Sequence, residues 1–513
     1  MKFTHNIFIL LLIGLAFQAV GQEFRYTKKI FGEIDTLKNV EYAQAEWLNN
    51  PIGLLADYNI HDGEQSTELR PLFMDLFLPK NDTVAKRPVI IFSHSGAFLT
   101  GSRLADDIVA FCDSFARQGY VTATIDYRLG MGADVTRFLG VIVGLSVSEE
   151  NAYRAAYRAT QDGRAAIGYL KQNADFYGID SSRVFLAGSS AGAIQDLSVL
   201  YLDQEQEIPE NTQNAPPLGS LDEIGPSGSY ASPDAVVAMW GATWNTSYIE
   251  NKQTPLLLMH GENDNIVPFK KGIPLVGSVP DNPLVKFKMP ETYGSYCIDT
   301  ALTNRGIPHE TYFVTDKGHE FYGVDTGIFP PEGPNEYWDT VHHKISEFLF
   351  QQIKPVADFD FILNENSLTT FNHSSDDYLI EWDFGDDTSS SSWEPEHVYD
   401  QKGRYKVSLK VCNAIMACDT ISKLVNVDFL SGAAVYNANE INIYPNPVSD
   451  RLTISGIDSS FDFRIVDLTG RTRRRLEQLK DSQIDLSLLR PGIYILEINF
   501  GQISLIKKIS KIK

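Results

Sequence analysis

Short apolar runs alternate with amphipathic helical patterns between residue 22 and about residue 354. Residues 151–174, for example, carry apolar side chains at helical spacing. Strands that alternate with helices predict a mostly parallel sheet covered on both faces, that is, a doubly wound α/β fold. The predicted strands are Val89–Phe92, Val121–Ile125, Val184–Ala187, Val236–Met239, Leu256–Met259 and Thr311–Val314.

The pattern changes after Lys354 and Pro355, where short strands and turns replace the helical segments. This change predicts small all-β sandwich domains in the last third of the chain. Within the first domain, residues 204–232 break the alternation with four prolines and several glycines. A loop of this length forms either a lid or rim over a site or a surface insertion, and the sequence leaves both open.

Length and charge narrow the classes of protein. The chain has 513 residues, more than one core can serve, so several domains are expected. Its formal net charge of −22 argues against a nucleic-acid partner, because the phosphates would be repelled. We interpret the acidic balance as a solvated surface that keeps an exported protein soluble.

The first 21 residues have the pattern of a signal peptide. A basic residue, Lys2, precedes the apolar run 7–17, and Ala19 and Gly21 place small residues at a cleavage site. The run is too short for a comfortable membrane span. We therefore expect an exported protein whose mature chain begins at Gln22.

Four cysteines are few for an oxidising compartment. Cys412 and Cys418 lie close enough in sequence to bridge a hairpin, a closure worth about 2 kcal/mol. Cys112 and Cys297 are either a pair or two inert buried thiols, and the sequence leaves this open.

A serine between two glycines at a strand-to-helix turn is the most informative motif of the chain. Gly188-Ser189-Ser190-Ala191-Gly192 follows a predicted strand and leads into a helical pattern. The glycines permit a sharp turn that holds the oxygen of the middle serine out of the sheet. We expect Ser190 to be a nucleophile.

Such a nucleophile needs a base and a carboxylate that orients the base. Asp264 follows the strand Leu256–Met259 in the segment His260-Gly-Glu-Asn-Asp-Asn-Ile-Val-Pro, and His319 follows the strand Thr311–Val314. Strand ends at one edge of a parallel sheet are the usual place for a site, and the order Ser, Asp, His is that of α/β-hydrolases. We expect Asp264 to orient His319, with Glu262 as the competing carboxylate. His260 is expected to be structural, and His342 and His343 to lie on the surface of a helix.

The oxyanion of acyl transfer needs backbone donors. The loop after Val89–Phe92, His94-Ser-Gly-Ala-Phe-Leu-Thr-Gly, resembles the His-Gly-Gly-Gly loop of lipases and esterases, with Ser95 and Ala97 in place of two glycines. The candidate donors are the N–H groups of Gly96, Ala97 and Ala191. The candidate substrate-binding aromatic residues are Phe98, Trp240 and Trp244, although aromatic residues at strand ends belong to the core at least as often.

Three segments resemble known families. Asp75-Leu-Phe-Leu-Pro, the His94 loop, Asp126-Tyr-Arg-Leu, Asp162-Gly-Arg-Ala-Ala and the three catalytic segments resemble α/β-hydrolase carboxylesterases, with secreted acetyl- and feruloyl-esterases as the nearest group. Trp382-Asp-Phe-Gly-Asp, His397-Val-Tyr and Gly403-Arg-Tyr-Lys-Val resemble the PKD domain, an Ig-like sandwich in which Trp382 and Phe384 point inward. Tyr444-Pro-Asn-Pro, Asp467-Leu-Thr-Gly, Pro491-Gly-Ile-Tyr and the basic end resemble the C-terminal sorting domain of the type IX secretion system of Bacteroidetes.

These observations predict five parts: a signal peptide (1–21), an α/β-hydrolase catalytic domain (22–354), a PKD domain (355–428), a linker (429–439) and a sorting domain (440–513). The resemblances imply a secreted or cell-surface serine carboxylic-ester hydrolase that uses no cofactor and no metal. Its partners would be an ester substrate, small or polysaccharide-linked, and the type IX secretion machinery. The aspartates Asp383, Asp386 and Asp387 are expected to serve turns rather than a metal.

Two other functions stay open at this stage. A peptidase of the prolyl-oligopeptidase type has the same triad order, but no propeller repeat precedes the catalytic domain. A non-catalytic surface protein would use the PKD domain for carbohydrate contact, although all three triad positions are filled.

Overall fold

The computed structural model describes residues 24–512 except 54–57, 203–206, 209–211, 213, 215, 226–231, 250–251, 277–284, 429–440, 456–459, 468–469, 480–481 and 501–502. The predicted signal peptide and the whole of the predicted linker therefore lie outside the described residues. The chain forms two compact units. The first comprises Met1–Lys354 and Asn413–Cys418, and the second Pro355–Cys412 and Asp419–Lys513.

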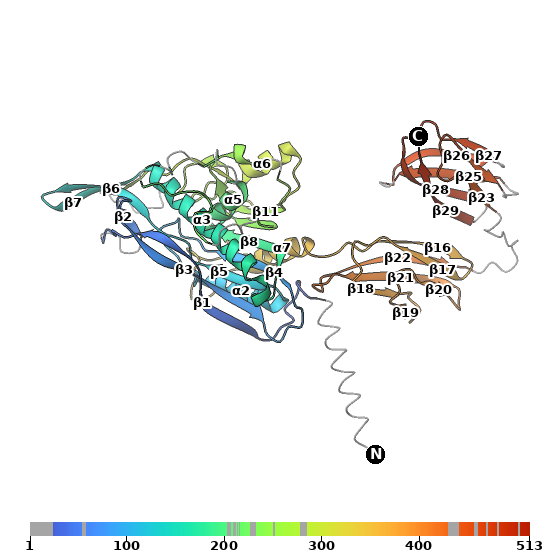
Figure 1. Ribbon diagram of the computed structural model, residues 1–513, viewed down its shortest axis with the longest axis horizontal. Helices are drawn as coiled ribbons and strands as arrows, with labels where there is room; N and C mark the ends of the chain where they lie inside the picture. The colour runs from blue at the N-terminus through green and yellow to red at the C-terminus, as the bar shows by residue number, and fades with distance from the viewer. Residues whose placement is uncertain are drawn as a thin grey trace, which may run out of the picture. The chain divides into compact units, whose positions relative to one another are not determined.

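An eight-stranded sheet lies at the centre of the first unit (Figure 1). The strands from β5 to β15 are parallel, and β1 and β3 are antiparallel at one edge. The prediction of a doubly wound, mostly parallel α/β-hydrolase sheet is confirmed. In spatial order the strands are β1 (Ile34–Leu48), β3 (Thr67–Pro79), β5 (Val121–Ile125), β4 (Arg87–Ser93), β8 (Ile179–Ser189), β9 (Ala235–Met239), β11 (Leu256–Gly261) and β15 (Glu310–Val314).

Helices cover both faces of this sheet, because the apolar side chains of its central strands point alternately to two cores. Ile91 and Leu186 belong to the core that α3 (Glu149–Gln172), α4 (Ala174–Tyr177), α5 (Ala191–Tyr201) and α6 (Ser295–Arg305) complete. Ile90 and Phe185 belong to the core that α2 (Asp106–Gln118) and α7 (Tyr337–Gln351) complete. Strands buried on both faces have no polar face, which explains their continuous apolar runs.

The helix predicted over residues 151–174 is α3, which begins two residues earlier. Ser148 caps it, since its hydroxyl accepts a hydrogen bond from the N–H of Asn151 at 3.2 Å. Two small sheets and a short 3₁₀ helix (Thr246–Tyr248) complete the unit. One sheet has the order β10 (Ala242–Thr243), β14 (Thr292–Gly294), β12 (Lys271–Gly272), and the other β13 (Val285–Phe287), β7 (Val141–Val147), β6 (Met131–Phe138), β2 (Ile60–Asp62).

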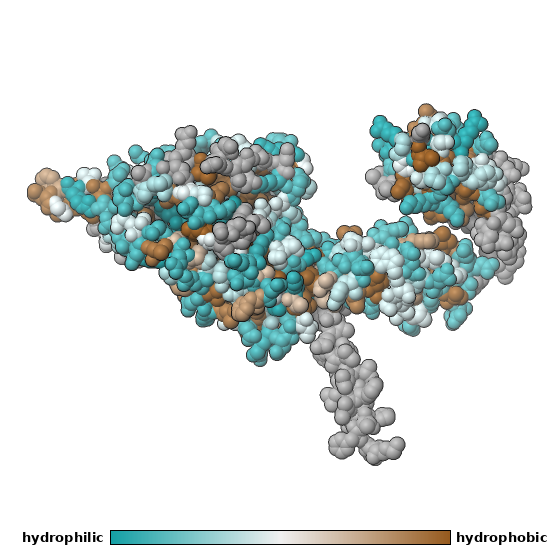
Figure 2. Space-filling model, viewed as in Figure 1, coloured by the Kyte–Doolittle hydropathy of each residue, from teal (hydrophilic) through white to brown (hydrophobic). Residues whose placement is uncertain are grey.

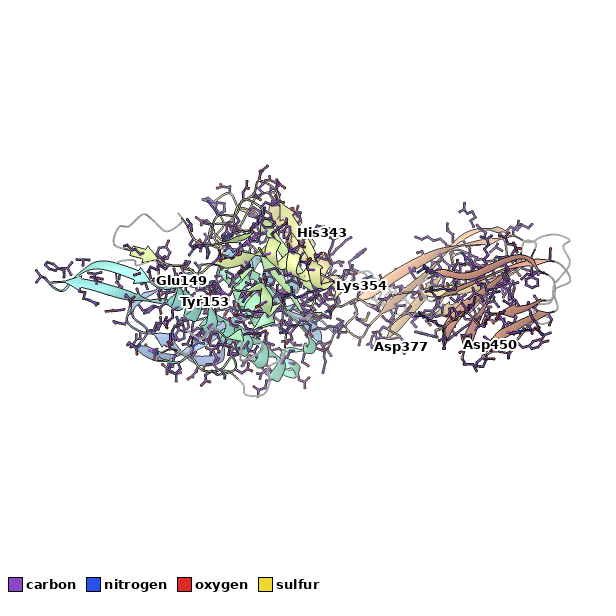
Figure 3. All side chains as sticks on the ribbon, turned by 90° about the horizontal axis from the view of Figure 1, so that it is seen from above. Glu149, Tyr153, His343, Lys354, Asp377 and Asp450 are labelled. Atoms are coloured by element: carbon purple, nitrogen blue, oxygen red, sulfur yellow. The ribbon has the colours of Figure 1, made fainter. Side chains whose placement is uncertain are left out.

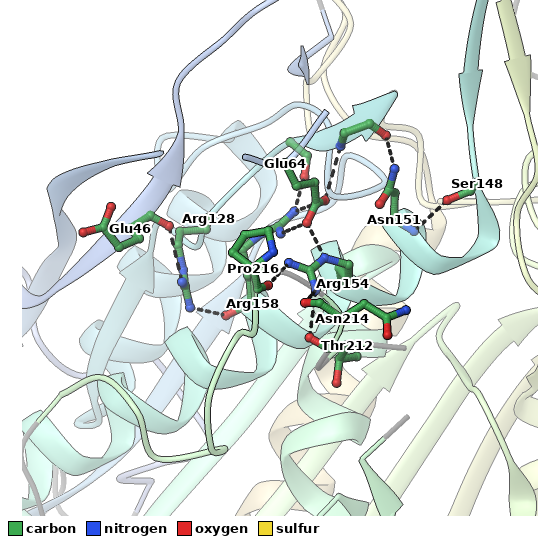
Figure 4. A network of polar contacts seen from close by, with 12 residues as sticks. Glu46, Glu64, Arg128, Ser148, Asn151, Arg154, Arg158, Thr212, Asn214 and Pro216 are labelled. Carbon is green, nitrogen blue, oxygen red and sulfur yellow. Dashed lines mark hydrogen bonds and ion pairs between the residues drawn. The ribbon is translucent and has the colours of Figure 1, made fainter. Parts of the chain in front are cut away.

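The described part of the 204–232 loop lies along α3 (Figure 4). The buried guanidinium of Arg154 donates hydrogen bonds to the carbonyl oxygens of Thr212 (2.8 Å), Asn214 (3.1 Å) and Pro216 (2.6 Å). Glu64 pairs with Arg154 from the other side and so neutralises its charge. This part of the loop is therefore anchored to a helix, while other residues of the loop lie outside the described residues.

One histidine prediction is wrong. His342 of α7 is half-buried rather than on the surface: its Nε2 lies 2.7 Å from the hydroxyl of Ser114, and its ring stacks on Phe115 at 4.7 Å. Burial lowers the pKa of His342 to about 4, so the ring is neutral at pH 7. His343, its neighbour on the helix, is exposed as expected (Figure 3).

The second unit consists of β-strands in small antiparallel sheets. In its first part Trp382 and Phe384 are buried as predicted, and Tyr399 donates a hydrogen bond to the carbonyl oxygen of Phe384 at 3.0 Å. Asp386 accepts hydrogen bonds from Thr388 and His397, which gives it a structural role in the turn. The strands of this part are β16 (Phe359–Asn364), β17 (Ser367–Asn372), β18 (Leu379–Asp383), β19 (Ser389–Ser390), β20 (Glu396–Val398), β21 (Gly403–Cys412) and β22 (Cys418–Val427).

The last part of the unit contains two further sheets, of three and four strands. Leu452 and Ile454 of one sheet and Ile465 and Leu496 of the other form a common core. The strands are β23 (Asn442–Tyr444), β24 (Arg451–Ser455), β25 (Phe461–Asp467), β26 (Thr472–Leu479), β27 (Ser482–Asp485), β28 (Gly492–Phe500) and β29 (Ile503–Lys511).

Cys412 and Cys418 are disulfide-bonded, as their spacing suggested, whereas Cys112 and Cys297 are free thiols. The sequence had left the state of the latter pair open. Within the described residues, no helix is both long enough and apolar enough to cross a membrane.

Candidate active site

Ser190 lies at a sharp turn between β8 and α5. Its backbone has φ 55° and ψ −115°, a conformation that a non-glycine residue rarely adopts. The neighbouring glycines are required by close packing: a Cβ on Gly188 would lie 2.3 Å from the carbonyl carbon of Gly192, and a Cβ on Gly192 would lie 2.2 Å from the carbonyl oxygen of Ser93. The turn predicted from the sequence is therefore present, and it holds the Ser190 side chain beyond the end of the strand.

Two neighbouring loops bring the other two residues to the same edge of the sheet. The loop after β11 carries Asp264, and the loop after β15 carries His319. The loops touch through the backbone, where the N–H of Asn263 donates to the carbonyl oxygen of Lys317 at 2.9 Å. Gly261 makes this approach possible, because a Cβ there would lie 2.4 Å from that same oxygen.

The three predicted side chains form a continuous hydrogen-bonded chain. His319 Nε2 lies 2.8 Å from Ser190 Oγ, and His319 Nδ1 lies 2.7 Å from Asp264 Oδ2. The carboxylate keeps the proton on Nδ1, so Nε2 faces the serine hydroxyl as an acceptor. Asp264 Oδ1 is held by the N–H groups of Ile266 (2.8 Å) and Val267 (3.0 Å). This geometry suits proton transfer from a serine nucleophile.

A second histidine also contacts Asp264. His260 Nε2 lies 3.1 Å from Asp264 Oδ2 and 3.0 Å from the carbonyl oxygen of Val267, so this nitrogen carries the proton and donates it. Nδ1 then accepts from the hydroxyl of Ser295 at 2.8 Å. Burial raises the pKa of Asp264, but the hydrogen bonds from His260 and His319 outweigh it and lower that pKa well below its ordinary value. Asp264 is therefore ionised. Glu262, the competing carboxylate, makes no such contact among the described hydrogen bonds.

The oxyanion loop after β4 has an unusual backbone. Gly96, Ala97 and Phe98 follow one another with φ of 120°, 55° and 61°. Within the described part of the chain, the N–H groups of Gly96 and Ala97 make no hydrogen bond, and the N–H of Ala191 lies in the first turn of α5, where helical N–H groups have no acceptor in their own helix. These three donors remain our candidates for the oxyanion.

The ring of His94 supports this loop. Its Nδ1 donates to the carbonyl oxygen of Ser95 at 2.6 Å, and the ring stacks on Tyr127 at 4.2 Å. The hydroxyl of Tyr127 in turn donates to the carbonyl oxygen of His94 at 2.8 Å. Burial lowers the pKa of His94 to about 4, so the ring is neutral and serves as structural support.

The three candidate substrate-binding aromatic residues are all buried. Phe98 packs edge-on against Tyr127, and Trp244 packs edge-on against Tyr153 at 4.9 Å. Trp240 has no exposed surface, and its indole N–H donates to Ser189 Oγ at 2.8 Å. The indole thus bonds to the residue that precedes the nucleophile, and a substrate contact by Trp240 stays a prediction, as it does for Phe98 and Trp244.

The neighbours of the nucleophile and of the base are also connected, which sequence reasoning missed. Ser189 Oγ, which accepts from Trp240, donates to Glu320 Oε1 at 3.3 Å. Ser189 precedes Ser190, and Glu320 follows His319. Trp240 and Glu320 share with Ser190 the left-handed backbone, with φ of 45° at both positions. The turns at Ser190, Trp240 and Glu320 are thus linked by one buried chain of hydrogen bonds.

A further buried carboxyl lies next to this chain. Asp107, at the start of α2, accepts a hydrogen bond from the hydroxyl of Tyr322 at 2.7 Å. Burial, with a smaller contribution from Glu320, raises the pKa of Asp107 to about 7.

No group of three or more His, Cys, Asp or Glu side chains suited to a metal occurs within the residues that the structure describes.

Comparison with protein families identifies three segments. Residues 64–206 match the carboxylesterase family, residues 360–425 match the PKD domain, and residues 442–512 match the secretion system C-terminal sorting domain. The first match includes Ser190 and the oxyanion loop and ends before Asp264 and His319.

Curated relatives are similar to about a quarter of this chain. Gut esterase 1 of Caenorhabditis elegans is 29% identical over 140 residues, which are 27% of this chain and 22% of that protein. Human carboxylesterase 5A is 29% identical over 130 residues (25% and 20%). Phenmedipham hydrolase of Pseudarthrobacter oxydans is 32% identical over 123 residues (24% and 21%). The chain thus spans about a fifth of the length of these relatives.

Solved esterase structures cover about half of this chain. Esterase 2 of Thermogutta terrifontis with bound propionate has a TM-score of 0.37 and 17% identity, covering 55% of this chain and 90% of that one. The family matches agree with the resemblances seen in the sequence, and the sorting domain marks the chain for secretion and the cell surface. The chain combines a carboxylesterase-family α/β-hydrolase domain with a PKD domain and a secretion system C-terminal sorting domain.

Proposed function

We propose that this chain is a secreted serine hydrolase that cleaves carboxylic esters through an acyl-enzyme. The observation that carries the proposal is the Ser190–His319–Asp264 chain, with contacts of 2.8 and 2.7 Å. It is supported by the carboxylesterase-family match around Ser190. The curated relatives named for esterase activity support the reaction type, although they share only part of this chain.

In the first half of the reaction, Ser190 Oγ attacks the ester carbonyl carbon and its proton passes to His319 Nε2. The carbonyl oxygen becomes an oxyanion, which the N–H groups of Gly96, Ala97 and Ala191 stabilise. The bond between the carbonyl carbon and the alcohol oxygen then breaks, and His319 gives its proton to the leaving alcohol. The acyl group stays on Ser190.

In the second half, water attacks the acyl carbon and gives a proton to His319 Nε2. The bond to Ser190 Oγ breaks, the serine recovers the proton, and the carboxylic acid leaves. Asp264 stays ionised throughout and orients His319. No proton, electron pair or group is required from a cofactor.

For the substrate we propose acetyl or feruloyl esters of plant polysaccharide, as in the secreted esterases that the sequence resembles. The type IX secretion machinery would act on the sorting domain, and the PKD domain would contact carbohydrate. Trp393 and Tyr378 support this last contact, because both are exposed aromatic side chains of that domain and such rings stack on sugars.

A hydrolysis profile tests the proposal. The chain from Gln22 is assayed on p-nitrophenyl esters from acetate to palmitate, on methyl ferulate, on acetylated xylan and on an X-Pro anilide. Turnover of acetate, ferulate or acetylated xylan supports the proposal. Hydrolysis of the anilide with no hydrolysis of any ester would instead indicate a peptidase. If no substrate is hydrolysed and the protein binds insoluble xylan, the result would indicate a binding protein.

A further inference from the structure

The β6–β7 hairpin projects from the first unit (Figure 1). At its base, β2 pairs with residues 131–133 of β6 and β13 pairs with residues 145–147 of β7. Between these supports, residues 134–146 of the two strands pair with each other across a turn at Leu139 and Gly140. Beyond its base, this ribbon therefore has no described strand beside it.

The tip of the hairpin, Phe138–Val143, is apolar and exposed. Phe138 is 67% exposed, Leu139 88%, Val141 64% and Val143 42%. In Figure 2 the end of the projection is brown, that is, hydrophobic. A soluble protein rarely places four large apolar side chains together at the end of an arm, so this tip indicates a binding surface.

The tip is also uncharged, in contrast to the rest of the chain. Residues 135–145 contain no Asp or Glu, although the chain carries a net charge of −22. Their one cation, Arg137, is ion-paired with Asp62 near the base of the hairpin. A charged partner would find no counter-charge here, whereas an uncharged apolar phase would accept the tip without loss of an ion pair.

The size of the tip favours a lipid surface over a second copy of the chain. Stable protein interfaces use roughly 20–30 residues on each side. Six residues at the end of a ribbon are too few for that, but a few inserted apolar side chains suffice for reversible attachment to lipid. The geometry is that of a small anchor.

The base of the hairpin is continuous with the candidate active site. Leu145 and Val147 belong to the same apolar core as Phe98 and Ala191. The strand then leads directly into α3, whose first turns carry Glu149 and Tyr153 (Figure 3). An attached tip would therefore hold the adjoining apolar core, which includes Phe98 and Ala191, near the surface to which the tip binds.

We propose that the tip of the β6–β7 hairpin inserts into an uncharged lipid surface, among the acyl chains of zwitterionic or neutral lipids. The apolar side chains leave water on insertion, and the low charge of the tip avoids a desolvation cost. Lipid binding by the tip does not depend on the reaction at Ser190. An experiment can therefore contradict one proposal without contradicting the other.

Flotation with phosphatidylcholine vesicles tests this inference. The protein begins at Gln22, so that the apolar segment 7–17 cannot contribute. The tip variant Phe138→Ser/Leu139→Ser/Val141→Ser is compared with Phe176→Ser, which removes another apolar side chain, 81% exposed, far from the hairpin in sequence. We expect the tip variant to bind at least tenfold less, and Phe176→Ser and Ser190→Ala to bind as the unchanged chain does.

Unchanged hydrolysis of p-nitrophenyl acetate and an unchanged circular dichroism spectrum would show that the tip variant is folded. The inference is overturned if the unchanged chain does not float, or if the tip variant floats equally well. It is also overturned if the chain is a dimer that the tip substitutions dissociate, because the tip would then bind a second copy.

Discussion

His260 contacts the same carboxylate oxygen, Asp264 Oδ2, that accepts the hydrogen bond of His319. The site therefore contains two histidines on one aspartate, of which only His319 reaches Ser190. His260 is fully buried, and both of its ring nitrogens have hydrogen-bond partners. We interpret it as a positioning residue for Asp264.

Replacement of His260 is expected to impair catalysis through Asp264. In His260→Ala the carboxylate loses one of its fixed donors, and we expect kcat to fall by roughly 10–100-fold, the cost of a slight misplacement of catalytic groups. His260→Gln, whose amide N–H can occupy the place of Nε2, should recover part of the loss. Steady-state kinetics on a p-nitrophenyl ester measures both. Equal kcat in all three proteins would contradict the positioning role.

The link from Trp240 through Ser189 to Glu320 gives a second prediction. Glu320→Ala leaves the Ser189 hydroxyl without its acceptor, so the turns at Ser190 and His319 lose a common support. We expect kcat to fall by roughly tenfold or more while KM changes little. Glu320→Gln retains an acceptor oxygen and should lose less.

Serine substitutions provide a matched control for this link. Ser189→Ala should resemble Glu320→Ala, whereas Ser198→Ala removes a hydroxyl that donates to the carbonyl oxygen of Ile194 within α5. If Ser198→Ala lowers kcat as much as Ser189→Ala does, the effect is one of general stability.

Asp107 gives a prediction about stability and pH. Burial first, and Glu320 second, raise its pKa from 3.8 to about 7 in the folded chain. The folded state therefore holds this proton more tightly than the unfolded state, so the contribution to stability is present below about pH 4 and is lost as the pH rises to about 7. The loss is at most on the order of 4 kcal/mol.

Asp107→Asn carries no charge at any pH and keeps an oxygen that can accept from Tyr322. We expect the difference in melting temperature, variant minus unchanged chain, to increase between pH 5 and pH 8. Thermal unfolding at several pH values measures it, and two parallel curves would show that Asp107 does not titrate in this range.

Arg154 gives a prediction about the 204–232 loop. In Arg154→Met the carbonyl oxygens of Thr212, Asn214 and Pro216 lose their shared donor, while Glu64 keeps its ion pair with Arg158. We expect faster proteolysis within residues 207–222, located by mass spectrometry of the fragments. Arg164→Met, which removes the ion pair with the exposed Asp222, should have a smaller effect.

The sequence predicted the parallel sheet and its edge well, because each catalytic candidate directly follows a strand and parallel strands end at one edge. It could not show the contacts among residues from different loops, such as Ser189 with Glu320 or His260 with Asp264. Nor could it show that the indole N–H of Trp240 donates to Ser189 Oγ, because the two residues come from different strand ends. The sequence did not predict the exposed β6–β7 hairpin, because an apolar run such as 141–145 has the same pattern whether it is buried or exposed.

Trapping of the acyl-enzyme tests the central claim most directly. The chain from Gln22 is mixed with p-nitrophenyl acetate, quenched with acid within the first turnovers, digested and analysed by mass spectrometry, with Ser190→Ala and Ser198→Ala in parallel. We predict one acetyl group on the peptide that contains Ser190 in the unchanged chain and in Ser198→Ala, and none in Ser190→Ala. Ester hydrolysis that continues in Ser190→Ala, or an acetyl group on another residue that accounts for turnover, would contradict the account.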